Sequence, residues 1–157
     1  MSPVFKKLGL RDRKQILVVN SPESFESELA ALEGVEVFRD PKQAKEVGLA
    51  LAFVTTYAEV DRLAPTITKK STGDAIVWIS YPKASSKHYK SEIKYGQGWA
   101  PLGKEGFEPV SMVAIDEDWS AVRFRRVAFI KQMNRPAEYR LTDAAQRKAP
   151  RRNKPRS

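Results

Sequence analysis

Polar side chains that could do chemistry follow several apolar segments of the sequence, at the point where each segment ends. Lysine can bind an anion or a carbonyl group, aspartate can transfer a proton, and asparagine, serine, threonine and tyrosine can orient a ligand by hydrogen bonds. If the fold places these ends together, the side chains form one ligand-binding edge. The candidate ligand-binding residues are Asn20, Ser21, Thr55, Ser80, Tyr81, Lys83, Asp116 and Trp119.

The candidates are densest in the Ser-Tyr-Pro-Lys segment that ends at Lys83 and in the Asp-Glu-Asp-Trp-Ser segment that begins at Asp116. Lys83 could contact an anion or a carbonyl group, although a solvated loop lysine fits the same pattern. Asp116 and Asp118 could transfer a proton or hold a divalent cation, but aspartate is also common in tight turns. Trp119 either folds over the edge or covers the end of the core. The sequence therefore leaves the catalytic residues unassigned.

Several kinds of site are disfavoured by the residues that the sequence lacks. Cysteine is absent and His88 is the one histidine, so disulfides, a cysteine nucleophile and a zinc site are excluded. His88 could act as an acid or base, or simply lie on the surface. Residues 19–24, after the first apolar segment, contain no glycine, and neither a Walker A sequence nor a G-x-S-x-G elbow is present. We therefore expect no metal and no cofactor, and disfavour dinucleotide binding, ATP hydrolysis and serine hydrolysis.

Short apolar segments alternate with amphipathic ones, and this alternation predicts strands separated by helices. Strands are predicted over residues 15–20, 35–40, 48–56, 75–80, 109–116 and 120–129. Helical spacing predicts one helix that buries Phe25, Leu29 and Leu32, and a second that buries Val60, Leu63, Ala64 and Ile67. Ser21 and Thr56 could cap these helices, Pro65 is expected to kink or shorten the second, and residues 72–74 are predicted to form a turn.

The order of these elements predicts the fold class. Strands joined through helical crossovers form a mostly parallel sheet with helices on both faces. The last two strands form a hairpin, in which Val122 and Phe124 alternate with Arg123 and Arg125 to give one apolar and one basic face. The predicted fold is a three-layer, Rossmann-like or flavodoxin-like α/β sheet, mostly parallel and closed by an antiparallel hairpin. In such sheets ligands bind outside the carboxyl ends of the strands, where the candidate residues lie.

The positive charge of the chain is concentrated at its C-terminal end. The 157 residues include 28 basic and 19 acidic ones, a net charge of +9. Residues 131–157, which we call the tail, hold nine of the basic and two of the acidic residues, so residues 1–130 carry only +2. The end of the tail has too few large apolar side chains to fold alone. We therefore predict a single α/β domain over residues 1–130 and a largely disordered basic tail.

A basic tail of this kind predicts a polyanionic partner such as nucleic acid, although a solubilising appendage would have the same composition. No aromatic residue lies among the basic ones of residues 147–156, so sequence-specific base stacking is not expected. No apolar run reaches about 18 residues and the N-terminus lacks a signal core, so we expect no membrane span and a cytoplasmic protein. The candidate polyanion-binding residues are Arg147, Lys148, Arg151, Arg152, Lys154 and Arg156.

Two motifs carry a resemblance to a family. The first, IVWISYPK, ends at Lys83 and has a Trp-x-Ser-x-Pro-Lys pattern; the second, VAIDEDWSAVRF, begins at Val113 and has an Asp-x-x-Trp-Ser pattern. With the segments 8–10 and 16–22, they resemble a bacterial family of small α/β proteins of unknown function, over about residues 8–127. The resemblance implies a bacterial cytosolic α/β protein and implies no activity. A looser similarity is to the catalytic fold of methyltransferases, from which this chain departs by lacking a glycine-rich first loop.

Two functions from different classes are compatible with these residues. The first is a non-enzymatic binding or regulatory protein, with a protein or small-molecule ligand at the strand ends and a polyanion on the tail. The alternative is a small transferase-like enzyme with a degenerate methyltransferase-like fold, in which Lys83 orients an anionic substrate and Asp116 or Asp118 moves a proton. An open pocket at the strand ends would favour the enzyme, whereas an edge filled by the chain's own side chains would favour the binding protein.

Overall fold

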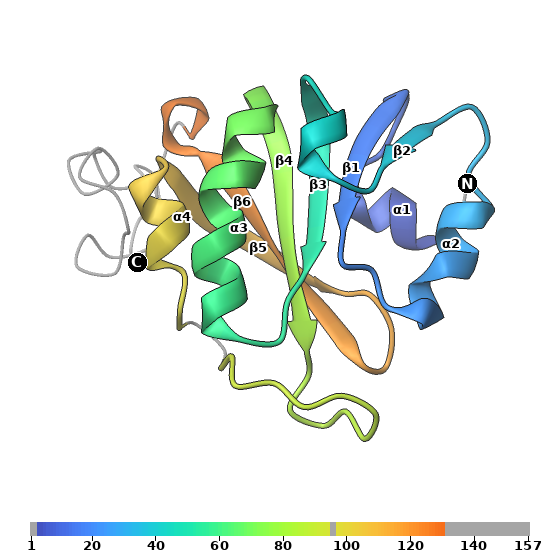
Figure 1. The fold of residues 1–157 in the computed structure, drawn as a ribbon, viewed down its shortest axis with the longest axis vertical. Coiled ribbons are helices and arrows are strands. Elements are labelled where there is room, and N and C mark those ends of the chain that lie inside the picture. The colour runs from blue at the N-terminus through green and yellow to red at the C-terminus, as the bar shows by residue number, and fades with distance from the viewer. Residues whose placement is uncertain (1–2, 95–96, 131–157) are drawn as a thin grey trace, which may run out of the picture.

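The computed structural model describes residues 3–94 and 97–130, which form a six-stranded sheet with the order β2-β1-β3-β4-β6-β5 (Figure 1). Strands β1 to β4 are parallel, and β6 is antiparallel to both of its neighbours. The strands are β1 Gln15–Val19, β2 Glu36–Phe38, β3 Val47–Phe53, β4 Ser71–Pro82, β5 Phe107–Ala114 and β6 Trp119–Arg126. The predicted α/β sheet with its closing hairpin is confirmed, and the tail with its candidate residues lies outside the described residues.

Helices cover both faces of this sheet, as predicted for a three-layer fold (Figure 1). Alternate residues of each strand point to opposite faces, so each strand contributes to two separate clusters of buried side chains. One cluster packs under α3 and α4, and the other under α1 and α2. The helices are α1 Pro3–Leu8, α2 Glu26–Ala30, α3 Tyr57–Lys70 and α4 Ala100–Lys104, with short 3-10 turns at Glu23–Phe25, Pro41–Gln43 and Val127–Phe129. No helix in the described part of the chain is long and apolar enough to span a membrane.

Helix α3 begins where the sequence predicts, but it continues past Pro65, the residue expected to kink or shorten it. The Thr56 hydroxyl accepts a hydrogen bond from the backbone N–H of Glu59, and the Glu59 carboxylate accepts one from the backbone N–H of Thr56, so the pair forms a capping box. Pro65 does not shorten the helix, which continues to Lys70. Pro65 is exposed, so water can replace the hydrogen bond that its missing N–H removes from the helix.

One local prediction is wrong, and one helix was missed. Residues 72–74 are not a turn between elements but lie inside β4, where the pairing with β3 jumps from Val47–Ser71 to Leu49–Ile76. Gly73 has a φ of 57°, a left-handed conformation that suits glycine in such a bulge. Helix α1 was not predicted, because its six residues are too few to show a helical period. Its last residue, Leu8, accepts a hydrogen bond of 2.8 Å from the buried indole N–H of Trp78.

A row of aromatic rings lies at the carboxyl end of the sheet, on the face that α1 covers. Phe25 from the first 3-10 turn stands between Phe5 of α1 and Phe53, the last residue of β3, with ring centroids 5.7 and 5.1 Å away. Trp119, the first residue of β6, lies 5.1 Å from Phe53 and 5.0 Å from Tyr89. These spacings are typical of favourable aromatic pairs. The row therefore joins α1, β3, β6 and the segment after β4.

Replacing the ring at the middle of this row should destabilise the protein strongly. Phe53 is 2% exposed, and Phe53→Ala should lower the free energy of unfolding by about 3–5 kcal/mol, because a cavity replaces two aromatic contacts. Urea unfolding followed by circular dichroism measures this change, and Phe53→Leu should lose less. Val110→Ala is the control, since Val110 is 42% exposed and its truncation should cost within about 0.5 kcal/mol. Equal losses at the two positions would contradict this account of the core.

Candidate functional site

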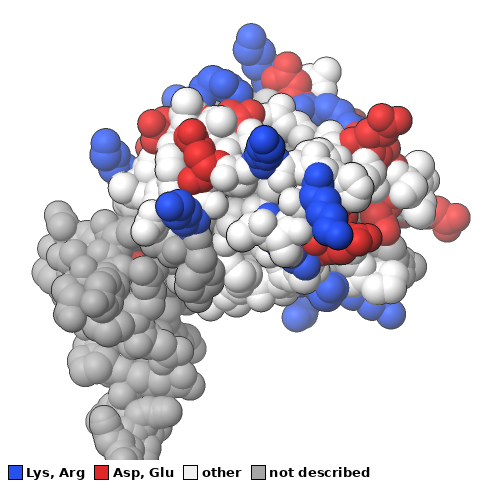
Figure 2. Space-filling model, turned by 90° about the horizontal axis from the view of Figure 1, so that it is seen from below, with Lys and Arg blue, Asp and Glu red and all other residues white. Residues whose placement is uncertain are grey.

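The structure brings the predicted ligand-binding residues to one end of the sheet. β1, β3 and β4 end there, and β6 begins there because Pro82 pairs with Trp119 in the antiparallel ladder. The arrows of β3 and β4 point to the bottom of Figure 1, and Figure 2 shows this end of the molecule with basic and acidic side chains intermingled. We call residues 20–21, 55–57, 80–83 and 116–119 the carboxyl edge. It includes the point between β1 and β3 where the strand order reverses, where ligands bind in sheets of this kind.

At the ends of β1 and β2 the carboxyl edge is closed by an ion pair. Arg39 donates two hydrogen bonds to the Glu26 carboxylate, at 2.6 and 3.0 Å, and Ser21 donates a third at 2.6 Å. The hydrogen bonds from Arg39 and Ser21 lower the pKa of Glu26 to about 2. The expectation that Ser21 caps a helix is wrong, because its hydroxyl bonds the Glu26 side chain and no side chain caps the 3-10 turn. Asn20 is exposed and has a left-handed φ of 60°.

At the end of β3 a carboxylate of the chain occupies the polar groups that a ligand would use. The Glu59 side chain accepts hydrogen bonds from the backbone N–H groups of Thr55 and Thr56, at 2.7 and 3.2 Å, and from the Thr55 hydroxyl at 3.2 Å. Backbone N–H groups before a helix are a common site for phosphate or carboxylate ligands. Here Glu59 takes that place, so Thr55 supports the cap of α3.

Residues 83–94, which we call the strap, leave β4 and cross to the turn after β3. The backbone N–H of Glu92 donates to the Thr55 carbonyl at 3.0 Å, and the Glu92 carboxylate accepts from the N–H of Tyr57 at 2.7 Å. Lys94 donates from its backbone to the Tyr57 hydroxyl at 3.3 Å. These bonds hold the strap against the turn that follows β3, along the bottom of Figure 1. The sequence contains little indication that residues 83–94 bond to this turn, because they show neither helical nor strand periodicity.

The predicted residues on β4 and β6 serve the fold. Ser80 is fully buried and donates to the Ser120 carbonyl at 2.9 Å, and Tyr81 packs on Trp99 with ring centroids 5.8 Å apart. Trp119 is 3% exposed, so it covers the end of the core and does not lie open at the edge. Asp116 accepts bonds from two backbone N–H groups of the turn that it begins, at 2.8 and 2.9 Å. Of the two interpretations of these residues, the structural one fits the geometry.

One cluster of polar side chains remains at the carboxyl edge. Asp118 accepts a hydrogen bond of 2.9 Å from the Ser86 hydroxyl, and its carboxylate lies 3.2 Å from Nδ1 of His88. The pKa of Asp118 is lowered, first by the Ser86 hydrogen bond and then by His88 and the charge of Lys83. In a catalytic triad the hydroxyl must bond the imidazole, which the carboxylate orients. Here Ser86 bonds the carboxylate instead, and His88 is 69% exposed, so the cluster does not activate a nucleophile.

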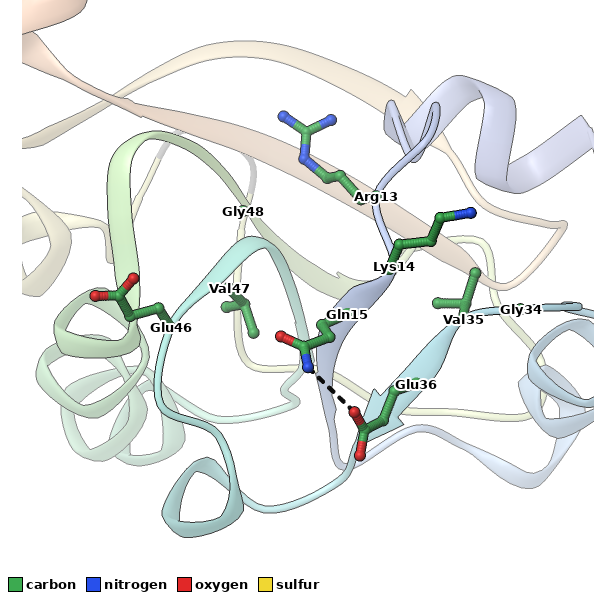
Figure 3. Close-up of a pocket in the computed structure, with 9 residues that line it drawn as sticks. All are labelled: Arg13, Lys14, Gln15, Gly34, Val35, Glu36, Glu46, Val47 and Gly48. Atoms are coloured by element: carbon green, nitrogen blue, oxygen red, sulfur yellow. Dashed lines mark hydrogen bonds between the residues drawn. The ribbon is translucent and has the colours of Figure 1, made fainter.

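Three hollows in the described part of the chain lie at the opposite end of the sheet. One, with a volume of about 660 Å3, is formed at the amino ends of β1, β2 and β3 (Figure 3). Gln15 and Glu36, joined by a hydrogen bond of 3.2 Å, stand on its floor, with Glu46 on one side. Two smaller hollows, of about 440 and 410 Å3, adjoin the start of β4 and residues 10–14. Sequence reasoning pointed to the other end of the strands.

No family model matches the chain, and no curated protein matches it in sequence. Solved structures match its fold. One is a SAM-dependent methyltransferase from Aquifex aeolicus, with a TM-score of 0.54, 14% identity and coverage of 78% of this chain and 87% of that one. Another is the N-methyltransferase NodS from Bradyrhizobium japonicum WM9, with a TM-score of 0.50, 13% identity and coverage of 77% and 91%. At this identity the likeness shows a Rossmann-like, methyltransferase-like fold.

The carboxyl edge does not fit S-adenosylmethionine, on which the Aquifex aeolicus enzyme depends. The turn after β1 has no glycine, so side chains rather than bare backbone face the space beside β1. The Glu26–Arg39 ion pair joins the ends of β1 and β2, and Glu59 already satisfies the backbone N–H groups after β3. The strap is bonded to the same turn. A cofactor at this edge would have to displace charged groups that are already paired.

The Glu26–Arg39 pair predicts a pH-dependent contribution to stability. The pKa of Glu26 is about 2 in the folded protein against an ordinary 4.5, so the stabilisation is complete above pH 4.5 and is lost as the pH falls towards 2. Glu26→Gln should therefore melt at a lower temperature than wild type at neutral pH, and the difference should shrink steadily below pH 4.5. Thermal melts across this range measure it. Glu23→Gln, on the preceding exposed turn, is the matched control, and a difference that does not change with pH would refute the assignment.

Proposed function

We propose that this chain is a binding or regulatory protein that uses a methyltransferase-like fold as a scaffold and contacts a polyanion such as nucleic acid, without catalysing a reaction. The observation that carries the proposal is the filled carboxyl edge. Three carboxylates of the chain, from Glu26, Glu59 and Glu92, bond the polar groups at the ends of β1 and β3. An enzyme needs those groups free to bind its substrate. Fold alone does not imply the reaction of its relatives.

The polyanion is proposed from the distribution of charge. The tail holds nine basic residues against two acidic ones. Each phosphate that such a segment neutralises releases counterions, so affinity would depend steeply on salt and little on base sequence. The proposed contacts are Arg147, Lys148, Arg151, Arg152, Lys154 and Arg156.

A small transferase-like enzyme is the second candidate, and the cluster around Asp118 is the observation that favours it. Ser86, His88 and Lys83 surround a carboxylate at the end of the sheet where ligands of this fold bind. In this alternative Lys83 orients an anionic substrate, and Asp118 or the exposed imidazole of His88 carries the proton. The alternative requires the strap to move away from the edge when the substrate binds.

Cofactor binding separates the two candidates. Neither S-adenosylmethionine nor S-adenosylhomocysteine should raise the melting temperature of the full chain or release heat in titration calorimetry, because the carboxyl edge is occupied by paired groups. A ligand at a hundred times its Kd would stabilise the folded state by about 2.7 kcal/mol, so binding would raise the melting temperature measurably. A methyltransferase of the same fold is the positive control. Stabilisation of this chain that disappears in His88→Ala or Asp118→Asn would overturn the proposal in favour of the enzyme.

The contribution of the tail is tested in the full-length chain. Replacing the six proposed contacts by glutamine should weaken binding to a labelled duplex by about tenfold or more at about 0.1 M salt, and should flatten the salt dependence. Fluorescence anisotropy across a salt series measures both. A second variant with Arg62, Lys69 and Lys104 of the α3 and α4 side changed to glutamine removes half as many charges from another surface, and it should lose far less than half of the effect. Unchanged affinity in the tail variant would remove the tail from the proposal.

A further inference from the structure

One part of the sheet carries basic side chains on a face that no long helix covers. Arg123 and Arg125 of β6 lie on the same face as Trp119 and Ala121, which pack in the cluster under α1. Helix α1 has only six residues, so it spans about 9 Å and leaves the β6 and β5 side of this face open. Residues 110–112 of β5 are exposed, and Arg123 and Arg125 are half-buried.

Four arginines gather at the upper end of this face. Arg125 pairs with Asp74 of β4 through two hydrogen bonds, of 2.8 and 2.7 Å. Arg13, just before β1, donates to the Gly9 carbonyl at 2.8 Å and crosses β3 so closely that a Cβ on Gly48 would lie 2.9 Å from its Nε. Burial and the positive charges of Arg125, Arg13 and Arg11 lower the pKa of Arg123, although Asp74 acts in the opposite direction.

A lysine extends this positive charge to the lower end of the same face. Lys7 of α1 donates its ammonium to the Ala114 carbonyl of β5 at 2.8 Å. Ala114 pairs with Ser120 of β6, so Lys7 and Arg125 lie about five residues apart along the strand, a distance of about 17 Å. The basic groups therefore extend along β6, with the four arginines at one end and Lys7 at the other. We call Lys7, Arg11, Arg13, Arg123 and Arg125 the basic strip.

The fold gains little from this arrangement. The Nε of Arg123 is buried without a hydrogen-bond partner among residues 3–94 and 97–130, which costs desolvation energy. Strands β4, β5 and β6 contain two acidic residues: Asp74 is paired with Arg125, and Glu108 is fully buried. A β-branched residue would suit the pleated surface at position 123 better than an arginine. An external anion would offset the mutual repulsion of the guanidinium groups.

We propose that the basic strip binds the phosphate backbone of nucleic acid along β6. This inference rests on the proposed function. It identifies the surface of the folded domain that would contact the nucleic acid. A strip about 17 Å long can span several successive phosphates of one strand, which a single small anion cannot do. The strip contains no aromatic side chain, so it contacts the backbone and does not stack on bases. Binding should therefore be strong at low salt and nearly independent of sequence.

The test compares full-length proteins that differ in the tail, the strip or both. The strip variant carries Lys7→Gln, Arg11→Gln and Arg123→Gln, and the control variant carries Arg62→Gln, Lys69→Gln and Lys104→Gln, which remove the same charge elsewhere. Each is made with the native tail and with the tail neutralised at the six residues named above. Labelled duplexes of two unrelated sequences are titrated by anisotropy across a salt series, beside vesicles of phosphatidylglycerol and phosphatidylcholine in equal parts.

We expect each lost phosphate contact to weaken binding about five- to tenfold at about 0.1 M salt and to lower the salt slope by about one, equally for both sequences. The strip variant should show this loss in both tail backgrounds, and the control variant should not. Arg123→Lys keeps the charge and should bind like wild type. Because Arg123 is half-buried, urea unfolding accompanies every variant, and Lys7→Gln with Arg11→Gln tests the strip through exposed residues alone.

The outcomes separate this inference from the proposed function. A strip variant that binds as tightly as the control variant in both backgrounds overturns the strip, whatever the tail does. Loss of binding in the strip variants with no effect of tail neutralisation supports the strip and removes the tail from the proposed function. Binding of wild type to the vesicles but to neither duplex overturns both, as does the absence of any binding.

Discussion

Strands β3 and β4 are apolar on both faces, and the rest of the fold follows from covering them. Leu49, Ala50, Leu51 and Ala52 are fully buried, and the facing segment of β4 from residue 75 to 82 is buried throughout. A strand with two apolar faces needs a layer on each side and a neighbour on each edge. Helices α3 and α4 supply one layer, α1 and α2 supply the other, and β1 and β6 are the neighbours. The antiparallel entry of β6 then places its first residue, Trp119, at the carboxyl ends of the parallel strands.

Because of that placement, the same contacts that stabilise the fold also fill the carboxyl edge. Trp119 completes the aromatic row with Phe53 and Tyr89, so the strap is held where an α/β enzyme would admit its ligand. The polar groups above the row are bonded among themselves, through Glu26 with Arg39 and through Glu59 with the turn after β3. The fold is shared with methyltransferases, but a fold supplies only the positions of the strand ends. The side chains at those positions decide whether a ligand enters, and in this chain they bond one another.

The same geometry explains why the basic side chains of β6 lie open. The short α1 covers β1, β3 and the middle of β4 through Leu8 and Trp78, and its Lys7 side chain reaches the end of β5 at Ala114. Beyond it the sheet faces solvent. On this face the side chains of β6 change from Ala121 to Arg123 and Arg125. The net charge of +2 over residues 1–130 does not show this local arrangement, in which Asp74 pairs with Arg125 of the basic strip. Under the proposed function, a polyanion would have two places to bind, the basic strip and the tail.

The sequence by itself determined the features that depend on neighbouring residues. Apolar runs and helical spacing located the strands, α3 and its Thr56 cap, and alternation gave β6 its apolar and basic faces. Only the tertiary structure decided the features that depend on residues far apart in the chain. The strand order, the bulge around Gly73, the Arg39–Glu26 pair and the partners of Asp118 join segments far apart in the chain or depend on a register between strands. Local periodicity shows which side of a strand is apolar, but it carries no information about which distant carboxylate or ring will meet the polar groups at the strand's end.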